Sequence, residues 1–247
     1  MNDCWSIYGG ASEAFRAPNL DDLTGNLAAK SGGPVLGDPT VDPENFITYE
    51  LGARRATKST MLNLTAFYTD VEDVIVPVFT DATLASSIST NAGEGYIYGA
   101  ELEGLWEICP QWSLSGFAAW QDSRVETPTI VGGPSIKKPN PRQLPLSGSV
   151  ALRWSDPEGK FWAEGRVLAA AREDRITALD QAADDQRIPT GGTPGYAVVS
   201  LRAGWNVNSH LNFTAGIENI LDDDYRVHGS GQNEPGLNAI VGARVIW

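Results

Sequence analysis

The sequence predicts an all-β protein whose long antiparallel strands form a segment of a transmembrane β-barrel. Apolar and polar residues alternate with a period of two in several windows, as they do on a strand with one apolar and one polar face. Most predicted strands have about 10 to 13 residues, whereas a tilted strand needs about 9–11 residues to cross a bilayer. Short and long connections also alternate, as in outer-membrane barrels.

Composition excludes several other classes of protein. The chain of 247 residues has a formal net charge of −13, so it lacks the basic surface that nucleic-acid binding requires. It contains no run of 18 apolar residues that could form a transmembrane helix. Cys4 and Cys109 are too few for a disulfide scaffold or a zinc cage. We also expect these two thiols to be free, because about three strand spacings separate them.

Ten strands follow from the alternation. In order along the chain, we expect them at residues 5–10, 46–56, 60–76, 94–106, 110–121, 144–155, 158–170, 193–206, 210–220 and 238–247. The short connections are 57–59, 107–109, 156–157 and 207–209, and the long ones are 11–45, 77–93, 122–143, 171–192 and 221–237. An outer-membrane barrel has tight periplasmic turns and long external loops, so the short connections define the periplasmic end.

The tryptophans provide a second indication of a membrane barrel. Because indole rings favour the membrane interface, a girdle should form at one level of the barrel. Only Trp120 falls near the external rim. The other seven lie near the periplasmic strand ends and form the expected membrane-interface girdle: Trp5, Trp106, Trp112, Trp154, Trp162, Trp205 and Trp247.

A soluble β-propeller is the alternative from another class, because some propeller blades also repeat at about 50 residues. Each blade needs four short strands, whereas each repeat here holds two long strands and one polar loop. The face opposite the apolar stripe carries acids and bases in similar number, which suits the interior of a barrel or an ordinary solvated sheet face equally well. These residues are Glu50, Arg54, Glu101, Glu103, Arg153, Glu164, Arg166, Arg202, Glu218 and Arg244.

Several short motifs together resemble those of TonB-dependent outer-membrane receptors. In chain order they are Ser12–Leu20 (SEAFRAPNL), Asp42–Glu44 before Tyr49–Gly52, Ala66–Tyr68 before Asp70 and Asp73, Gly99–Glu103, Asn219–Asp222 before Tyr225 and Arg226, and Gly229–Gly236 before a final strand that ends in an aromatic residue. Each motif is short, but their order and their span over nearly the whole chain make the resemblance specific. Two positions depart from the family pattern, namely Leu237 after Pro-Gly and the terminal Trp247.

The resemblance implies a non-enzymatic receptor that takes up a scarce ligand of the ferric siderophore, haem or cobalamin class. Because such transporters have 22 strands around a plugged lumen, residues 1–247 correspond to a half-open, C-terminal part of the barrel in the cell outer membrane. We expect neither a plug domain nor a signal peptide in them. The implied partners are outer-membrane lipid, the plug and N-terminal strands, the barrel-assembly machinery and, through the plug, the TonB complex; no cofactor and no nucleic acid are implied.

Candidate ligand contacts are five arginines in the external loops, because the guanidinium group suits an anionic ligand: Arg16, Arg172, Arg175, Arg187 and Arg226. A closed ten-stranded outer-membrane hydrolase is a further alternative, in which His228 beside Asp222–Asp224 activates water; we favour a plain loop residue there. The acidic groups near Asp70 and in loop 171–192 lack the spacing of an EF-hand, so we assign no metal and no catalytic residue.

Overall fold

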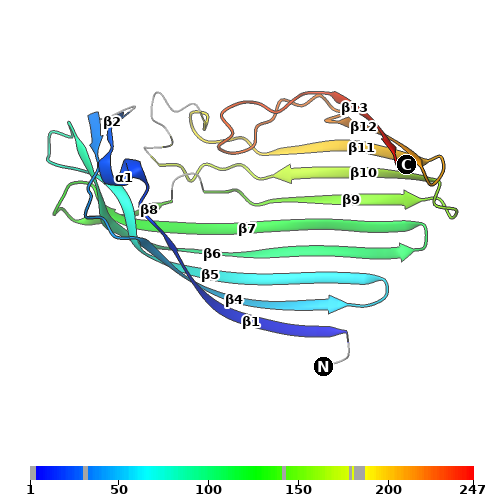
Figure 1. Cartoon of the computed structure of the whole chain (residues 1–247), viewed down its shortest axis with the longest axis horizontal. Coiled ribbons are helices and arrows are strands. Elements are labelled where there is room, and N and C mark those ends of the chain that lie inside the picture. The colour runs from blue at the N-terminus through cyan, green and yellow to red at the C-terminus, as the bar shows by residue number, and fades with distance from the viewer. Residues whose placement is uncertain (1–3, 30–32, 141–142, 178–179, 181–186) are drawn as a thin grey trace.

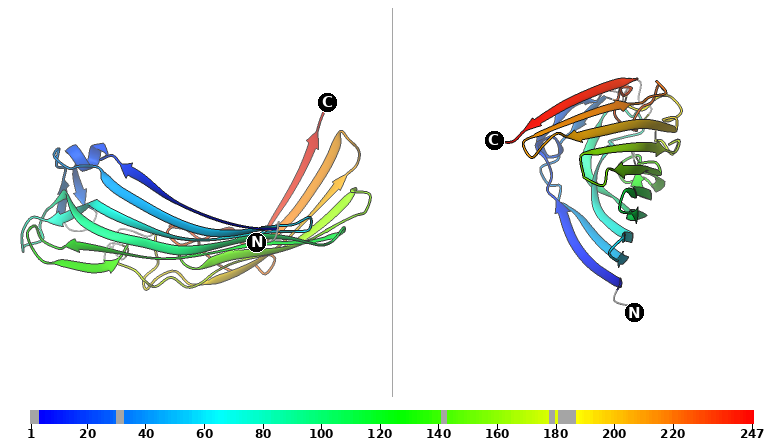
Figure 2. Two further views of the ribbon diagram at one scale, coloured as in Figure 1. Left: turned by 90° about the horizontal axis from the view of Figure 1, so that it is seen from below. Right: turned by 90° about the vertical axis from the view of Figure 1, so that its right-hand side faces the viewer.

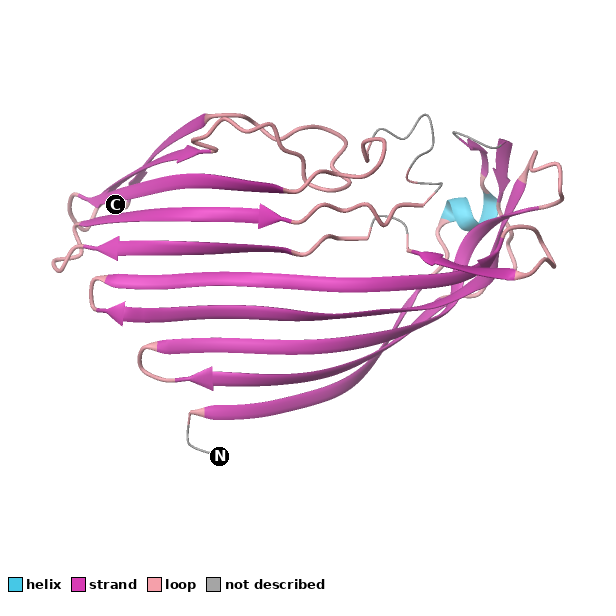
Figure 3. Cartoon of the chain, turned by 180° about the vertical axis from the view of Figure 1, so that it is seen from behind, coloured by secondary structure: helices cyan, strands magenta, loops and turns pink. Residues whose placement is uncertain are grey.

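The computed structural model describes residues 4–29, 33–140, 143–177, 180 and 187–247 as one curved antiparallel sheet (Figure 1). Its main path is β1-β4-β5-β6-β7-β9-β10-β11-β12-β13, so all ten predicted strands are present and each pairs with its neighbours along the chain. No helix in this part of the chain is long and apolar enough to cross a membrane. Within the described ranges, α1 is the one helix and has five residues (Figure 3).

The strands of the main path are long, and three further strands are short. The main strands are β1 (Trp5–Arg16), β4 (Glu44–Ala56), β5 (Thr60–Phe79), β6 (Ser87–Cys109), β7 (Trp112–Pro128), β9 (Ser147–Ser155), β10 (Phe161–Ala170), β11 (Tyr196–Asn206), β12 (Leu211–Glu218) and β13 (Asn238–Val245). The remaining elements are α1 (Leu20–Thr24), β2 (Asn26–Ala29), β3 (Gly33–Leu36) and β8 (Ser135–Pro139).

Four tight turns join consecutive strands at one end of the sheet, which we call the short-turn end, and the long connections lie at the other, the long-loop end (Figure 1). Local side chains close these turns. The Thr57 hydroxyl accepts hydrogen bonds from the amides of Ser59 and Thr60, and the Asn208 side chain accepts from those of His210 and Leu211. Such side-chain contacts are the reason that Asn, Asp and Ser/Thr favour turns.

The sheet does not close. Within the described residues β1 pairs only with β4 and β13 only with β12, and the view along the strands shows an open gap between these two edges (Figure 2). The predicted half-open sheet is therefore confirmed. A propeller would divide the strands among several blades, and a closed barrel would pair the first strand with the last, so the topology excludes both alternatives.

The long-loop end contains more strand than the sequence indicated. β5 and β6 have 20 and 23 residues, so most of the expected loop 77–93 is paired, while β1 continues to Arg16 and β7 to Pro128. A bulge between Val71 and Val74 accommodates this extension. The predicted ends of these strands are wrong because polar residues such as Ser87 and Ser89 are typical of loops, although here they lie buried in β6.

The buried core gathers at the long-loop end, because elsewhere the sheet is a single layer with no second layer to cover it. Val71, Ile75, Val78 and Val125 are buried where the extended hairpins of β5–β7 meet the loops. By contrast, large apolar side chains along the middle of the strands are exposed, with Leu51 at 64%. A face of this kind requires another apolar medium to cover it.

Candidate functional site

The pairing register sorts the side chains onto an apolar face and a polar face. Leu64 pairs with Leu102, which pairs with Ala118, and Leu201 pairs with Ile217. Since directly paired residues point to the same side of a sheet, these side chains form one continuous belt across the strands. The members of the belt include Ile7, Leu51, Leu64, Leu102, Leu114, Val150, Leu152, Val167, Leu201, Ile217 and Val241.

Tryptophans border this belt at the short-turn end. Trp112 of β7 pairs directly with Trp154 of β9, and Trp205 stacks on Phe161 with 5.8 Å between the ring centroids. Trp5 lies on the same face, where the Arg55 guanidinium sits 5.9 Å from its ring. Trp106 pairs with Thr60 beside a short turn, and Trp247 follows the end of β13. All seven predicted girdle residues thus occupy the short-turn end, and those in the strands, apart from Trp162, share the apolar face.

Trp162 differs, because the register turns it to the polar face. It pairs with Ser155 and Gly204, and the Arg153 guanidinium lies 4.0 Å from its ring centroid, a cation–π contact. Its indole lies over Gly204, where a Cβ would approach Nε1 to 2.1 Å. Side chains alternate between the two faces along β10. Phe161 therefore occupies the apolar face, and Trp162, the next residue, occupies the polar face.

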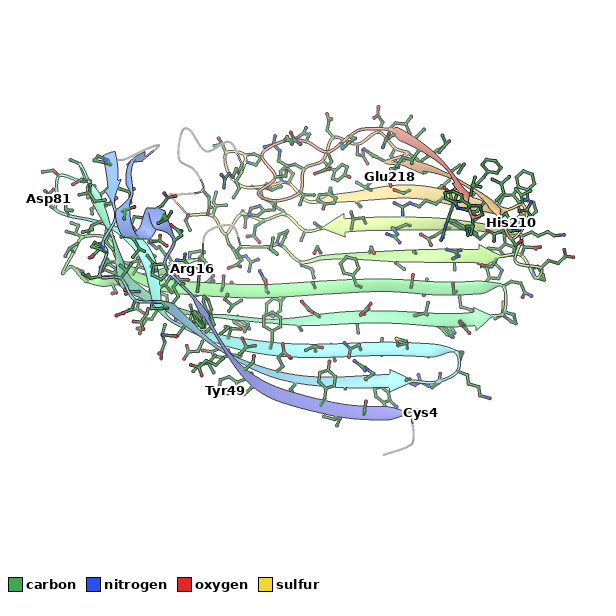
Figure 4. The ribbon with its side chains drawn as sticks, in the orientation of Figure 1. Cys4, Arg16, Tyr49, Asp81, His210 and Glu218 are labelled. Atoms are coloured by element: carbon green, nitrogen blue, oxygen red, sulfur yellow. The ribbon has the colours of Figure 1, made fainter. Side chains whose placement is uncertain are left out.

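A second aromatic row, which the sequence reasoning missed, borders the belt at the long-loop side. Tyr49, Tyr68 and Tyr98 are paired across β4, β5 and β6, and the Tyr98 ring meets Trp120 edge-on at 5.5 Å. Figure 4 shows Tyr49 projecting from its strand. Tyr98 and Trp106 stand eight residues apart in β6, or about 26 Å along a strand. At the strand tilt of about 35–45° this corresponds to a height of about 19–22 Å, so the two aromatic rows are spaced to border the apolar band of a membrane barrel, which is about 25 Å tall.

The polar face carries ion pairs and hydrogen bonds instead. Arg202 binds Glu218 at 2.6 Å, and the Glu164 carboxylate lies 3.3 Å from Arg166 and 3.9 Å from Arg153. The Tyr8 hydroxyl reaches two strands across to Asn63 and Thr65 over Gly52. Except for the Glu164–Arg166 pair within β10, these contacts link different strands, as expected for the water-facing interior of a barrel.

Arg16, a predicted ligand contact, is engaged within the protein. Its guanidinium donates to both oxygens of the buried Glu44, at 2.5 and 2.7 Å, and to Asp22 at 3.1 Å. The hydrogen bonds to Glu44 raise the pKa of Arg16 further. Glu44 also accepts the Ile75 amide at 2.9 Å. Arg16 therefore ties β1 to α1 and β4, next to the helix in Figure 4.

Arg175 is held in a similar way. It donates three hydrogen bonds to the Glu173 carboxylate, from its backbone amide and from Nε and Nη2, at 2.6–3.0 Å, and one to Asp122 of β7 at 3.1 Å. Burial acts to raise the pKa of Asp122, but the hydrogen bond from Gln143 and the guanidinium of Arg124 outweigh burial and hold that pKa below its ordinary value. Arg175 thus fastens the β10–β11 loop to β7.

The remaining arginines lie in the loops that follow β10 and β12. Arg172 is mostly exposed, close to Asp174 at 3.3 Å, and donates to the carbonyl of Gly191. Arg226 donates to Asn233 at 3.2 Å, and the backbone of Arg187 lies against Gly231. No described contact gathers the five arginines around one point, so a ligand role for each of them stays a prediction.

The two histidines occupy opposite ends of the sheet. His210 lies at the short-turn end, where its Nδ1 is 2.9 Å from the carbonyl oxygen of Ile246 (Figure 4). His228 is buried at the long-loop end with Nδ1 2.9 Å from the Thr193 hydroxyl. Among the described residues, no group of three or more His, Cys, Asp and Glu side chains is arranged to hold a metal ion, and Cys4 and Cys109 are unpaired.

Comparisons with known proteins identify what the chain resembles. Residues 1–220 match the family model "TonB dependent receptor-like, beta-barrel". The chain is 30% identical over 151 residues to the iron-regulated outer membrane virulence protein of Vibrio cholerae, covering 56% of this chain and 23% of that protein. It is 25% identical over 202 residues to the catecholate siderophore receptor Fiu of Escherichia coli, covering 81% of this chain and 25% of that receptor.

A solved structure has the same fold. The copper transporter OprC superposes with a TM-score of 0.77 at 18% identity, over 99% of this chain and 37% of that one. At this identity the likeness shows the fold alone. The chain spans about a quarter of the length of the curated relatives. The matched family and these relatives are receptors and transporters, in line with the expectation of a non-enzymatic protein.

Proposed function

The chain belongs to the TonB-dependent receptor β-barrel family of the outer membrane, and we propose that it supplies the C-terminal part of a 22-stranded receptor barrel. On this proposal the other strands and the plug lie outside residues 1–247, and the apolar belt faces outer-membrane lipid. The barrel-assembly machinery inserts the barrel, and the TonB complex drives uptake through the plug.

The observation that supports this proposal is that, among the described residues, each edge strand of the sheet lacks a partner on its outer side. The apolar face of the same sheet is bordered by two aromatic rows. Edge strands β1 and β13 have 12 and 8 residues, and their free amides and carbonyls would face hydrocarbon. Each unsatisfied group costs several kcal/mol in lipid. Pairing of both edges with further strands removes that cost, so the sheet needs additional barrel strands in order to function in a membrane.

The proposed ligand is a scarce metal complex of the ferric siderophore, haem or cobalamin class. The names of two relatives support the iron-containing members of this group, because one is iron-regulated and the other is a catecholate siderophore receptor. The loops at the long-loop end form the outer part of the ligand vestibule on this proposal. Arg16 and Arg175 are bound to buried carboxylates, which argues against ligand contacts by these two side chains, and Arg172, Arg187 and Arg226 stay the candidates that the sequence predicts.

Uptake measured in the native host tests the proposal. The coding segment for this chain is deleted, and accumulation of radiolabelled iron from a panel of ferric siderophores and haem, and of labelled cobalamin, is compared with the parent strain under iron limitation. We expect loss of uptake of at least one ligand, restoration by the intact segment, and the same loss when TonB is removed. Unchanged uptake of every ligand in the panel would contradict the proposed function.

A further inference from the structure

Two loops at the long-loop end meet through a buried polar contact. The β10–β11 loop (171–195) is narrowed by an antiparallel bridge between Glu173 and Thr193, with two backbone hydrogen bonds of 3.0 and 2.9 Å. Next to this bridge, the hydroxyl oxygen of Thr193 lies 2.9 Å from Nδ1 of His228, which belongs to the β12–β13 loop (219–237). Thr193 and His228 are only 3% and 8% exposed. This contact is shielded from water, which would otherwise compete for both groups.

The contact continues into the rest of the protein. Glu173, 1% exposed, binds Arg175, which in turn reaches Asp122 of β7. A chain of polar contacts therefore runs from β7 through the β10–β11 loop to His228. Release of His228 would free the β12–β13 loop at its midpoint, while the links from Arg175 to β7 would remain.

His228 is poorly placed to accept a second proton. Its Nε2 is buried and has no hydrogen-bond partner among the residues that the structure describes, so the imidazolium form would bury an unsatisfied charged N–H, which is strongly unfavourable. Burial accordingly lowers the pKa of His228, against the opposing attraction of Glu173 and Asp180.

The charged groups around His228 explain why burial prevails. Both oxygens of Glu173 are engaged by Arg175, and Asp180 accepts the amide and hydroxyl of Thr177. On its own loop Arg226 stands two residues before His228, and Arg187 packs against Gly231 three residues after it. The carboxylates near His228 therefore already have partners of their own, and their attraction offsets the effect of burial only in part.

We propose that His228 and Thr193 form a proton-sensitive latch that holds the β10–β11 and β12–β13 loops together at neutral pH and releases them on acidification. In the released state His228 is exposed to water and titrates near its ordinary value of about 6.5. The latched state binds fewer protons, so its stability is fully present above that pH and is lost as the pH falls toward the lowered value. Within this window each pH unit shifts the ratio of latched to released molecules about tenfold.

The latch rests on the proposed function only in that its loops must face the external medium. Its test is a distance measurement and requires no uptake. Spin labels are attached at Thr190→Cys and Gln232→Cys, two exposed positions, in the full chain in its native outer membrane, with Cys4 and Cys109 replaced by Ser. Pulsed electron–electron resonance then gives the distance distribution between the two loops. We expect one narrow distribution at pH 7.5 and a second, longer population at pH 5.

Two variants separate the latch from a general effect of acid. His228→Gln keeps a hydrogen-bonding partner for Thr193 but cannot gain a charge, so its distribution should stay narrow at both pH values. Thr193→Val removes the hydroxyl and should give the longer population at both. The latch is overturned if the parent distribution is the same at pH 7.5 and 5, if His228→Gln retains the response to pH, or if Thr193→Val stays narrow. Loss of uptake in the deletion strain tests the proposed function and does not depend on whether the latch exists.

Discussion

The two ends of the sheet are stabilised by different surroundings. Toward the short-turn end the sheet is one layer thick, its apolar side chains are exposed, and Trp112, Trp154 and Trp205 line the border. At the long-loop end extended hairpins and loops enclose buried residues such as Val78 and Glu173. On the proposed function the first region depends on lipid and on strands that pair with β1 and β13, whereas the second supplies its own partners. Conditions that remove lipid should therefore disturb the first region and spare the second.

The largest expected effect concerns the open edges. Production of the chain without complementing strands should give inclusion bodies, because two rows of backbone groups have no partner in lipid. Fractionation of the cells followed by electrophoresis of heated and unheated outer membranes measures this. A heat-modifiable monomer extracted from the membrane would mean that the edges can be satisfied within the chain, and it would remove the need for further strands.

A charge in the middle of the belt comes next. Leu102 lies halfway between Tyr98 and Trp106 on β6, so Leu102→Arg should cost about 2–4 kcal/mol, the penalty for arginine at the bilayer midplane. The fraction of chain that is folded in the outer membrane measures the loss. Glu103→Arg places the same side chain at nearly the same depth on the polar face and is the matched control. Equal losses for the two variants would show that the apolar face does not meet lipid.

The long-loop end gives a smaller effect. Glu173→Ala removes the carboxylate that holds Arg175, and the loss of a buried partner costs roughly 3–5 kcal/mol; partial exposure of Arg175 reduces this to about 1–3 kcal/mol. Hydrogen exchange of the β10–β11 loop should accelerate accordingly, with little change in the strands. Asp174→Ala is the control, because its pair with Arg172 is exposed on both sides and contributes about 0–1 kcal/mol. Similar exchange in both variants would argue against the network as the support of this end.

The same contrast explains what could be predicted from sequence. In the single-layer region the period of two sets the face that each residue occupies, so the ten strands and the common face of Trp112 and Trp154 follow from alternation. The tyrosine row was hidden because Tyr49, Tyr68 and Tyr98 meet only once the register of three strands is known. Trp162 was assigned to the girdle only because it lies near the periplasmic end of its strand, although the alternation of side chains along β10 places it on the polar face.

At the long-loop end the sequence could not reveal the side-chain contacts, for a different physical reason. Arg16 and Arg175 were predicted as ligand contacts, and their partners Glu44 and Asp122 are 28 and 53 positions away. His228 was predicted to be a plain loop residue, and its contact Thr193, 35 positions earlier, gives no local signal. Contacts of this kind depend on how the loops fold over the strands, and no periodic pattern encodes them.

The hollow beneath Trp162 has an evolutionary consequence. Because the indole occupies the volume in which a side chain at position 204 would lie, neither residue can be exchanged independently. Homologues with a residue larger than glycine at position 204 should have a smaller side chain than tryptophan at position 162. Position 153 should vary with them, because Arg153 then loses its cation–π contact. Covariation among these three positions is thus to be expected from geometry alone.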